Sequence, residues 1–234
     1  MRSAKEVQPR GLWIAIDGPA GSGKTTVGRR LAAKLGFQFI NTGSMYRAVA
    51  WGLGQGLKLE EMGLELEGER LLLNGRDITA DLYNEELDRR ASEAARDPKV
   101  RAFLIARQRE LAKGRNVVME GRDIGRVVLP EAEVKIFLEA SLGERARRRW
   151  RERGGSLEEI EQEMAKRDAR DHDFGRLDPL PDAIVIATDG LTVEQAVAQV
   201  LAAVREALGG DESLGKAGEG SLLSGERGGP RADL

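Results

Sequence analysis

The feature that most constrains the fold is a short apolar run that passes directly into a glycine-rich segment. Residues 12–17, Leu-Trp-Ile-Ala-Ile-Asp, form this nearly continuous run. An apolar run that ends at glycine is typical of a parallel strand covered on both faces. Beyond the glycines, Val27, Leu31 and Leu35 recur at helical spacing. The sequence therefore predicts a strand, a tight turn and a helix in immediate succession.

The turn itself, residues 18–25, matches the pattern G-x-x-x-x-G-K-[ST]. Its glycines allow backbone N–H groups to surround phosphate oxygens, and the following helix directs its positive end at the same place. We expect Lys24 to bridge the outer phosphates of ATP and the Thr25 hydroxyl to hold Mg²⁺. A turn that merely joins strand to helix is the alternative. The residues predicted to bind the phosphates of ATP are Gly18, Pro19, Ala20, Gly21, Ser22, Gly23, Lys24, Thr25 and Thr26.

This loop does not identify what receives the phosphate, because GTPases, ATP-driven motors and small-molecule kinases share it. An Asn-Lys-x-Asp segment for guanine recognition is missing, which disfavours a GTPase. A motor would show an apolar strand ending in a magnesium-side aspartate, and the nearest candidate ends in Glu120-Gly121-Arg122-Asp123. The acceptor must therefore be inferred from other segments.

Four more apolar runs predict the remaining strands of one sheet: 37–41, 116–120, 134–138 and 183–187. Helical patterns separate them, and this alternation predicts a doubly wound α/β fold with a five-stranded parallel sheet flanked by helices. Residues 64–79 instead alternate with period two, which predicts a small antiparallel insertion. Residues 84–113 are expected to form two helices that separate at Asp97-Pro98.

Composition excludes several classes of protein. The chain has 234 residues, 41% apolar and 32% charged, with no cysteine and a formal charge of −2, so thiolate chemistry and a general attraction for nucleic acid are not expected. No run is long enough for a membrane helix and no secretory signal is visible, so we expect a cytoplasmic location without membrane contact. Residues 1–11 are expected to be an N-terminal extension, and the glycine-rich residues 209–234 a disordered tail.

Polar residues follow two of the predicted strands, where open parallel sheets bind ligands. Thr42, Tyr46 and Arg47 follow one strand, and Arg122 and Asp123 follow another between glycines. An arginine at such a place can grip phosphate oxygens in a bidentate manner, and an aspartate can accept from an exocyclic amine. Packing or a local ion pair is an equally plausible interpretation of each segment alone.

A third group lies later in the chain. Arg167 and Asp171 stand four apart on one helix face. Six arginines within 145–153 form either a solvated face or a mobile cationic cover, such as a lid that closes over phosphates. His172, the only histidine, is expected to be a neighbour of this group rather than a catalyst.

Four segments together resemble the bacterial cytidylate kinases: Ile14–Thr26, Asn41–Val49, Glu120–Val128 and Val134–Ser141. The resemblance spans about residues 12–208. It implies a nucleoside-monophosphate kinase fold, with a monophosphate-binding lobe at about 43–113 and a short lid at about 145–172. It also implies Mg²⁺-dependent transfer of the γ-phosphoryl group of ATP to CMP or dCMP by a monomer that acts on these small molecules alone.

The resemblance also assigns roles to individual residues. Lys24, Arg122, Arg167 and Asp171 are implied to be catalytic, and Arg149 to bind ATP. The phosphate and sugar of CMP are implied to contact Thr42, Tyr46, Arg47, Arg122, Arg167 and Asp171. Ser92, Arg101 and Asp123 are implied to read the cytosine, whose amino donor and ring acceptors suit a carboxylate beside a cation or hydroxyl.

One position departs from the family pattern. An arginine is expected three residues after Asp171, where this chain has Phe174, and Arg176 follows two residues later. We predict that Arg176 takes that role. Two other hypotheses stay open at this point: a P-loop NTPase whose arginine-rich stretch senses a macromolecule, and a nucleotide-dependent binding module that recruits a partner through its tail. Formation of ADP only in the presence of CMP or dCMP would separate the kinase from both.

Overall fold

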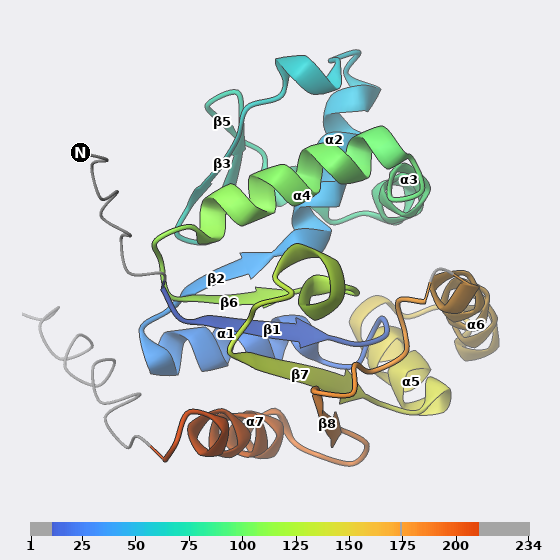
Figure 1. Ribbon diagram of the computed structural model, residues 1–234. Helices are drawn as coiled ribbons and strands as arrows, with labels where there is room; N and C mark the ends of the chain where they lie inside the picture. The colour runs from blue at the N-terminus through green and yellow to red at the C-terminus, as the bar shows by residue number, and fades with distance from the viewer. Residues whose placement is uncertain (1–10, 174, 211–234) are drawn as a thin grey trace, which may run out of the picture.

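The computed structural model describes residues 11–173 and 175–210 (Figure 1). Residues 1–10, Phe174 and residues 211–234 lie outside the described residues, and with them most of the expected extension and tail. The strands are β1 (Trp13–Asp17), β2 (Gln38–Asn41), β3 (Leu64–Glu67), β4 (Arg70–Leu73), β5 (Arg76–Asp77), β6 (Val117–Glu120), β7 (Val134–Glu139) and β8 (Ile184–Ala187). Within this described part, the larger sheet has five parallel strands in the order β2-β6-β1-β7-β8, as predicted.

Helices connect these strands and cover both faces of the sheet. They are α1 (Lys24–Leu35), α2 (Thr42–Gly54), α3 (Glu85–Ala94), α4 (Pro98–Ala112), α5 (Leu142–Arg153), α6 (Leu157–Asp173) and α7 (Val193–Ala207), with short turns at Leu59–Glu61, Thr79–Leu82 and Ile124–Val128. Ile14 and Ile16 of β1 pack with α1 and α7, whereas Ala15 packs in the cluster that contains α2 and α4. Successive side chains of a strand point to opposite faces, so β1 is buried on both. This arrangement confirms the doubly wound α/β class.

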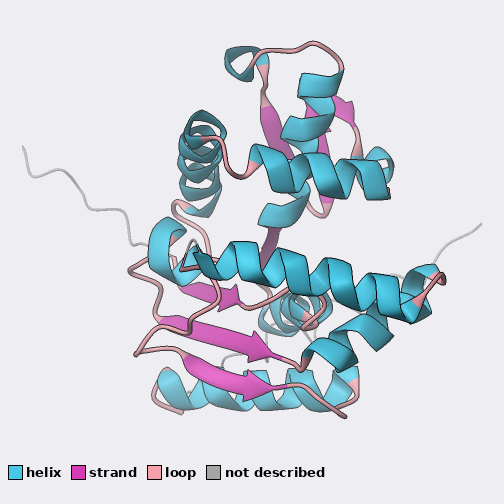
Figure 2. Ribbon diagram, turned by 90° about the vertical axis from the view of Figure 1, so that its right-hand side faces the viewer, coloured by secondary structure: helices cyan, strands magenta, loops and turns pink. Residues whose placement is uncertain are grey.

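The predicted insertion forms a second sheet in which β3, β4 and β5 pair antiparallel. Asn74 and Gly75 make its second turn with φ of 51° and 76°, the left-handed conformation that an Asn-Gly turn requires. Asp97 caps α4 through its side chain, which accepts from the Lys99 N–H at 2.8 Å, so the helices separate where predicted. Figure 2 shows this small sheet and its helices as a lobe above the main sheet.

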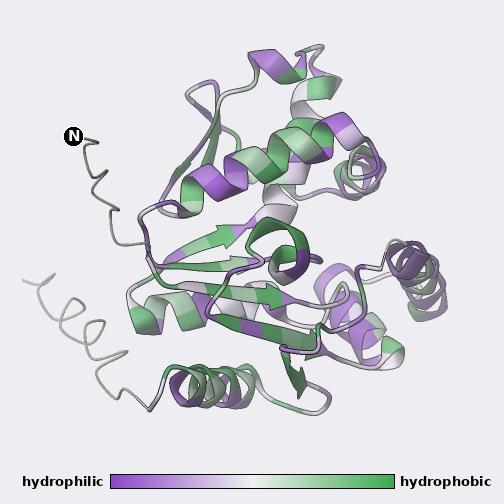
Figure 3. Cartoon of the chain, in the orientation of Figure 1, coloured by the Kyte–Doolittle hydropathy of each residue, from purple (hydrophilic) through white to green (hydrophobic). Residues whose placement is uncertain are grey.

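Helices α5 and α6 form a different kind of unit, with little core of their own. In α6 only Met164 is buried, and it packs with Ala20 and Ala146. Figure 3 shows the main sheet as largely hydrophobic and these two helices as largely hydrophilic. They lie beyond the ends toward which the strand arrows point, so they face the carboxyl edge of the sheet (Figure 1).

Candidate active site

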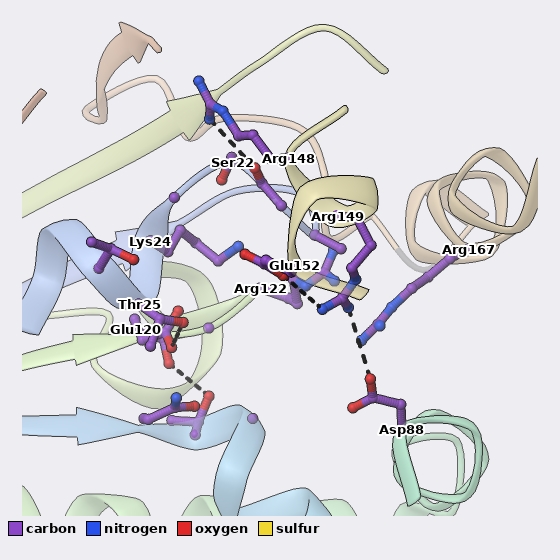
Figure 4. Close-up of a pocket in the computed structure, with 18 of the residues that line it drawn as sticks. Ser22, Lys24, Thr25, Asp88, Glu120, Arg122, Arg148, Arg149, Glu152 and Arg167 are labelled. Atoms are coloured by element: carbon purple, nitrogen blue, oxygen red, sulfur yellow. Dashed lines mark hydrogen bonds and ion pairs between the residues drawn. The ribbon is translucent and has the colours of Figure 1, made fainter. Parts of the chain in front are cut away.

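A cavity of about 1080 Å³ lies at the carboxyl edge of the main sheet (Figure 4). Its wall combines the glycine-rich loop, the starts of α1 and α2, the inner side of α3 and residues of α5 and α6. Of the residues predicted to act in the site, Gly18 and Pro19 are not part of the wall. Those that line it are Ala20, Gly21, Ser22, Gly23, Lys24, Thr25, Thr26, Thr42, Tyr46, Arg47, Ser92, Arg101, Arg122, Asp123, Arg149, Arg167, Asp171 and Arg176.

The glycine-rich loop has the backbone that its sequence predicts. Gly18 has a φ of 144°, and a Cβ there would lie 2.1 Å from the Leu138 carbonyl oxygen, so only glycine fits. Gly23 caps α1 in the left-handed conformation, and α1 begins at Lys24. The positive end of α1 therefore points into the cavity, as an anion site requires.

Lys24 is buried in this loop, and its Nζ donates to the Pro19 carbonyl oxygen at 2.6 Å. Burial, together with the positive charge of Arg122, lowers the pKa of Lys24 to about 7. The carboxylates of Glu120 and Asp17 act in the opposite direction but do not compensate. The ammonium group therefore lacks sufficient negative charge around it, which a nucleotide phosphate would supply.

Thr25 and Glu120 meet at the first turn of α1. The Thr25 hydroxyl donates to Glu120 Oε1 at 2.7 Å, and the Thr42 hydroxyl donates to the Glu120 carbonyl oxygen at 2.7 Å. Glu120 ends β6 and is only 5% exposed (Figure 4). A hydroxyl and a carboxylate are oxygen ligands that suit Mg²⁺, so the residues present fit the predicted metal. The sequence analysis named only Thr25 as a metal ligand, and the structure places the Glu120 carboxylate beside it.

Asp17 is a site residue that the sequence analysis missed. Its carboxylate, at the end of β1, accepts from the backbone N–H of Ile124 at 2.7 Å and of Gly125 at 2.8 Å. Burial raises the pKa of Asp17 to about 6 even though both hydrogen bonds lower it. Asp17 thus holds the loop that carries Arg122 and Asp123 against the sheet. The residue stands next to the glycine motif, but no local pattern reveals this contact, because its partners lie over 100 positions away.

Arginines from separate elements also line the cavity. Arg122 Nη1 lies 2.8 Å from Asp171 Oδ2, and both side chains are less than a fifth exposed. The charge of Arg122, followed by burial, lowers the pKa of Arg167 to about 10. Arg47 on α2 pairs with Asp88 at 2.6 Å. Positive charges this close in a partly buried site repel one another, so the cluster favours an anionic ligand.

The predicted cytosine-reading residues also lie together. Arg101 donates to Asp123 Oδ2 at 2.6 Å, and both are largely buried. Tyr46 is partly buried beside them, and its loss of solvent raises the pKa of its phenol. Ser92 of α3 completes this part of the wall. The pair Arg101 and Asp123 offers a donor and an acceptor that are close enough to share one base edge.

Arg176 lies with these groups although it is displaced along the chain. Its side chain is 10% exposed, with Nε 3.8 Å from Asp123 Oδ2 and Nη1 3.9 Å from Asp171 Oδ1. Its backbone N–H donates to the Asp171 carbonyl oxygen at 3.0 Å, which turns the chain back toward α6. Arg176 thus places a guanidinium group beside Asp123 and Asp171. That it takes the role of the arginine expected at Phe174 stays a prediction.

The six arginines of α5 do not behave as one group. Arg145 is 5% exposed and is held by the Ala140 carbonyl oxygen at 2.9 Å and by Asp168 at 2.6 Å, so it is part of the interior. Arg148 donates to Thr188 Oγ1 at 3.1 Å beside the phosphate loop. Neither a uniform solvated face nor a uniform mobile cover describes the segment. Arg147 and Arg151 are exposed.

Other wall residues had no individual role predicted from the sequence. Asp88 and Thr188 line the cavity without belonging to a motif. Arg148 and Arg153, the latter paired with Asp88, come from the arginine-rich stretch 145–153. Alternating charges on α3 and α5 resemble any solvated helix, and only the fold shows which of them face inward. His172 is exposed and lies 3.8 Å from Asp178, as expected for a neighbour rather than a catalyst.

With the phosphate loop and a cluster of arginines lining one cavity, the fold and the site define a P-loop kinase. The chain belongs to the cytidylate kinase family, because the model of that family, described as cytidylate kinase, matches residues 14–206. A cytidylate kinase of Caldanaerobacter subterraneus subsp. tengcongensis is 44% identical over 82% of this chain and 94% of its own length. A cytidylate kinase of Geobacillus kaustophilus is 43% identical over 86% of this chain and 99% of its own length.

A solved structure of an uncharacterized protein from Eubacterium ventriosum resembles this chain with a TM-score of 0.51. It is 14% identical and covers 82% of this chain and 98% of its own, so it supports the fold alone. Over residues 11–173 and 175–210, no helix combines the length and the apolar character needed to span a bilayer. The same residues hold no cluster of three or more histidine and acidic side chains that could bind a metal by themselves.

Proposed function

We propose that this chain transfers the γ-phosphoryl group of ATP to CMP or dCMP, giving ADP and CDP or dCDP. An oxygen of the monophosphate forms a bond to the γ-phosphorus, and the bond from that phosphorus to the bridging oxygen of ADP breaks. The observation that carries the proposal is that one cavity joins the phosphate loop, the arginine cluster and the pair Arg101 and Asp123. Membership of the cytidylate kinase family supports it.

At the donor end, the backbone N–H groups of residues 20–26 would surround the β- and γ-phosphates. Lys24 would leave the Pro19 carbonyl oxygen and bridge the same phosphates, whose negative charge would raise its pKa. Thr25 and Glu120 would hold Mg²⁺, which supplies positive charge to the transferring phosphates. Arg149, on the opposite wall, would contact ATP.

At the acceptor end, Arg47, Arg122 and Arg167 would bind the phosphate of CMP and stabilise the charge that spreads over the transferring group. Asp171 keeps Arg122 in place through the ion pair at 2.8 Å, and it would also accept from the sugar. Thr42 and Tyr46 would complete the contacts to the phosphate and sugar. Positioning of two phosphates in line is the main catalytic contribution that such a site makes.

The base would be read by Ser92, Arg101 and Asp123, with Arg176 beside them. Asp123 would accept from the exocyclic amine of cytosine, and Arg101 would donate to a ring acceptor. Uracil presents a carbonyl oxygen in place of the amine, so it would leave Asp123 without a donor. A site built around a specific hydrogen bond rejects an analogue that lacks it.

The organisation of the domain is also a proposal. The core at 12–208 would carry a monophosphate-binding lobe at about 43–113 and a lid at about 145–172, which correspond to α2 to α4 and to most of α5 and α6. We propose that the chain acts as a monomer in the cytoplasm, on nucleotides alone. Sedimentation in the presence and absence of CMP would test the monomer.

The test is an acceptor screen that measures ADP formation with CMP, dCMP, UMP, AMP and no acceptor. We expect ADP only with an acceptor, and a clear preference for CMP or dCMP over UMP. An Asp123→Asn variant should lose that preference, because its amide can donate to uracil as well as accept from cytosine. Hydrolysis of ATP at the same rate without acceptor would contradict the proposal and favour an NTPase.

A further inference from the structure

Three guanidinium groups converge on the carboxylate of Asp88 in α3. Arg47 Nε lies 2.6 Å from Asp88 Oδ1, Arg149 Nη2 lies 3.8 Å from Oδ2, and Arg153 also donates to Oδ2. Arg47 belongs to α2, whereas Arg149 and Arg153 belong to α5. Figure 4 shows Asp88 facing Arg149 across the cavity. One carboxylate thus connects α2 and α5 through the wall of the site.

This arrangement differs from an ordinary surface ion pair, which is exposed and contributes little. The side chain of Asp88 is 14% exposed and that of Arg47 is 18% exposed. All four residues line the large cavity. In the proposed function, Arg47 binds the phosphate of CMP and Arg149 contacts ATP. Asp88 therefore holds one arginine from each half of the site.

The charges around Asp88 explain why a carboxylate is tolerated at an anion site. Burial alone would raise the pKa of Asp88, but the charges and hydrogen bonds of Arg47 and Arg153 outweigh it, so the carboxylate stays ionised. Burial and the charge of Arg153 lower the pKa of Arg149, whereas Asp88 raises it. Without Asp88, several cations would face one another across a site that contains no phosphate. A carboxylate oxygen and a phosphate oxygen also use the same N–H donors.

We propose that Asp88 is an internal counterion that occupies phosphate-binding arginines in the empty enzyme and is displaced by the substrate phosphates. The inference rests on the proposed function. Asp88 does not touch the reacting atoms in this account, so it is a positioning residue. It keeps the arginines together between turnovers, and it weakens nucleotide binding because every substrate must compete with it.

The test compares the binding of CMP and of inorganic phosphate to the wild type and to Asp88→Asn by titration calorimetry. We expect the dissociation constants to fall by about three- to tenfold in the variant, because a like charge next to the ligand has been removed. The KM for CMP should fall by a similar factor while kcat does not rise. Binding should also become more sensitive to salt, because more uncompensated positive charge faces the ligand.

Two variants serve as controls. Glu86→Gln removes the same charge from the same helix at an exposed position outside the cavity wall, and it should bind CMP as the wild type does. Asp88→Glu keeps the charge and should restore affinity close to that of the wild type. Circular dichroism spectra and urea midpoints would establish that each variant is folded.

Unchanged or weaker CMP binding by a folded Asp88→Asn would overturn the inference, and so would equal binding by Asp88→Glu and Asp88→Asn. Failure of the proposed function gives a different result, since the wild type itself would then not phosphorylate CMP.

Discussion

The two phosphate sites proposed for the cavity are built by different means. The donor end consists mainly of backbone N–H groups and a helix terminus from one continuous segment, with Lys24 as its cation. The acceptor end consists of side chains from α2, α6 and the loop after β6, held by ion pairs such as that of Arg122 with Asp171. A site made of backbone tolerates changes in most side chains around it, whereas a site made of charged side chains depends on each of them and on their partners.

The largest expected effect is that of Lys24→Met, because Lys24 is the cation that the glycine-rich loop itself supplies to the donor end. We expect kcat to fall by about a thousandfold, since a preorganised donor to developing charge is lost. A coupled assay of ADP formation measures it. Lys34→Met, at an exposed position of the same helix, is the matched control and should leave kcat unchanged. A loss of less than tenfold would mean that the backbone alone suffices.

Arg122→Met tests the acceptor end. We expect kcat to fall by about a hundredfold, and Arg122→Lys to recover only part of it, because an ammonium group cannot reproduce the bidentate geometry of a guanidinium. The variant also removes the closer of the two cations that face the partly buried Asp171, the other being Arg176, so a lower urea midpoint should accompany the loss. Arg126→Lys, exposed on the same loop, should have no comparable effect. Full recovery by lysine would show that the charge acts without directional contacts.

A smaller effect is expected at the displaced arginine. Arg176→Ala should raise the KM for CMP by about tenfold, the size of a lost hydrogen bond to a charged group, with a smaller change in kcat. Steady-state kinetics at varied CMP would measure this. Unchanged KM and kcat would show that Arg176 does not take the role of the arginine expected at Phe174.

A separate effect concerns stability and pH. Lys24 titrates near pH 7 in the folded chain and at its ordinary value of 10.5 when unfolded, so between these values the unfolded chain binds more protons. The free energy of unfolding of the wild type should therefore rise with pH above about 7, relative to Lys24→Met, and should run parallel to it below 7. Urea titrations over this range measure the difference. Parallel curves throughout would show that Lys24 is not titrating near neutrality.

The contrast between a donor end built from one continuous segment and an acceptor end built from several explains what could be predicted from the sequence. The strand, loop and helix of the donor end are local, so the apolar run and the glycine pattern are enough to predict them. The antiparallel insertion and the break at Asp97-Pro98 were likewise predictable from turn and helix-breaking residues. The family resemblance added acceptor residues that local patterns left undecided.

What the sequence could not reveal depends on contacts between distant segments. Asp17 looks like the last residue of a strand, and its hydrogen bonds to Ile124 and Gly125 exist only after the sheet has formed. Asp88 looks like one more charge on a charged helix until α5 is placed opposite it. The arginine-rich stretch is uniform in sequence, yet burial assigns Arg145 to the interior and leaves Arg147 exposed. Burial is a property of the fold, so composition cannot supply it.

The strand order has a consequence for the synthesis of the chain. β1 lies between β6 and β7, and β2 pairs with β6. Trp13 of β1 therefore has no partner in the sheet until Val117 of β6 has been synthesised. A ribosome must therefore polymerise about half of the protein while the two earliest strands of this sheet remain unpaired. During that interval the apolar run of β1 is open to aggregation or to a chaperone. The central strand of the finished sheet is thus the one that the nascent chain leaves unpaired for longest.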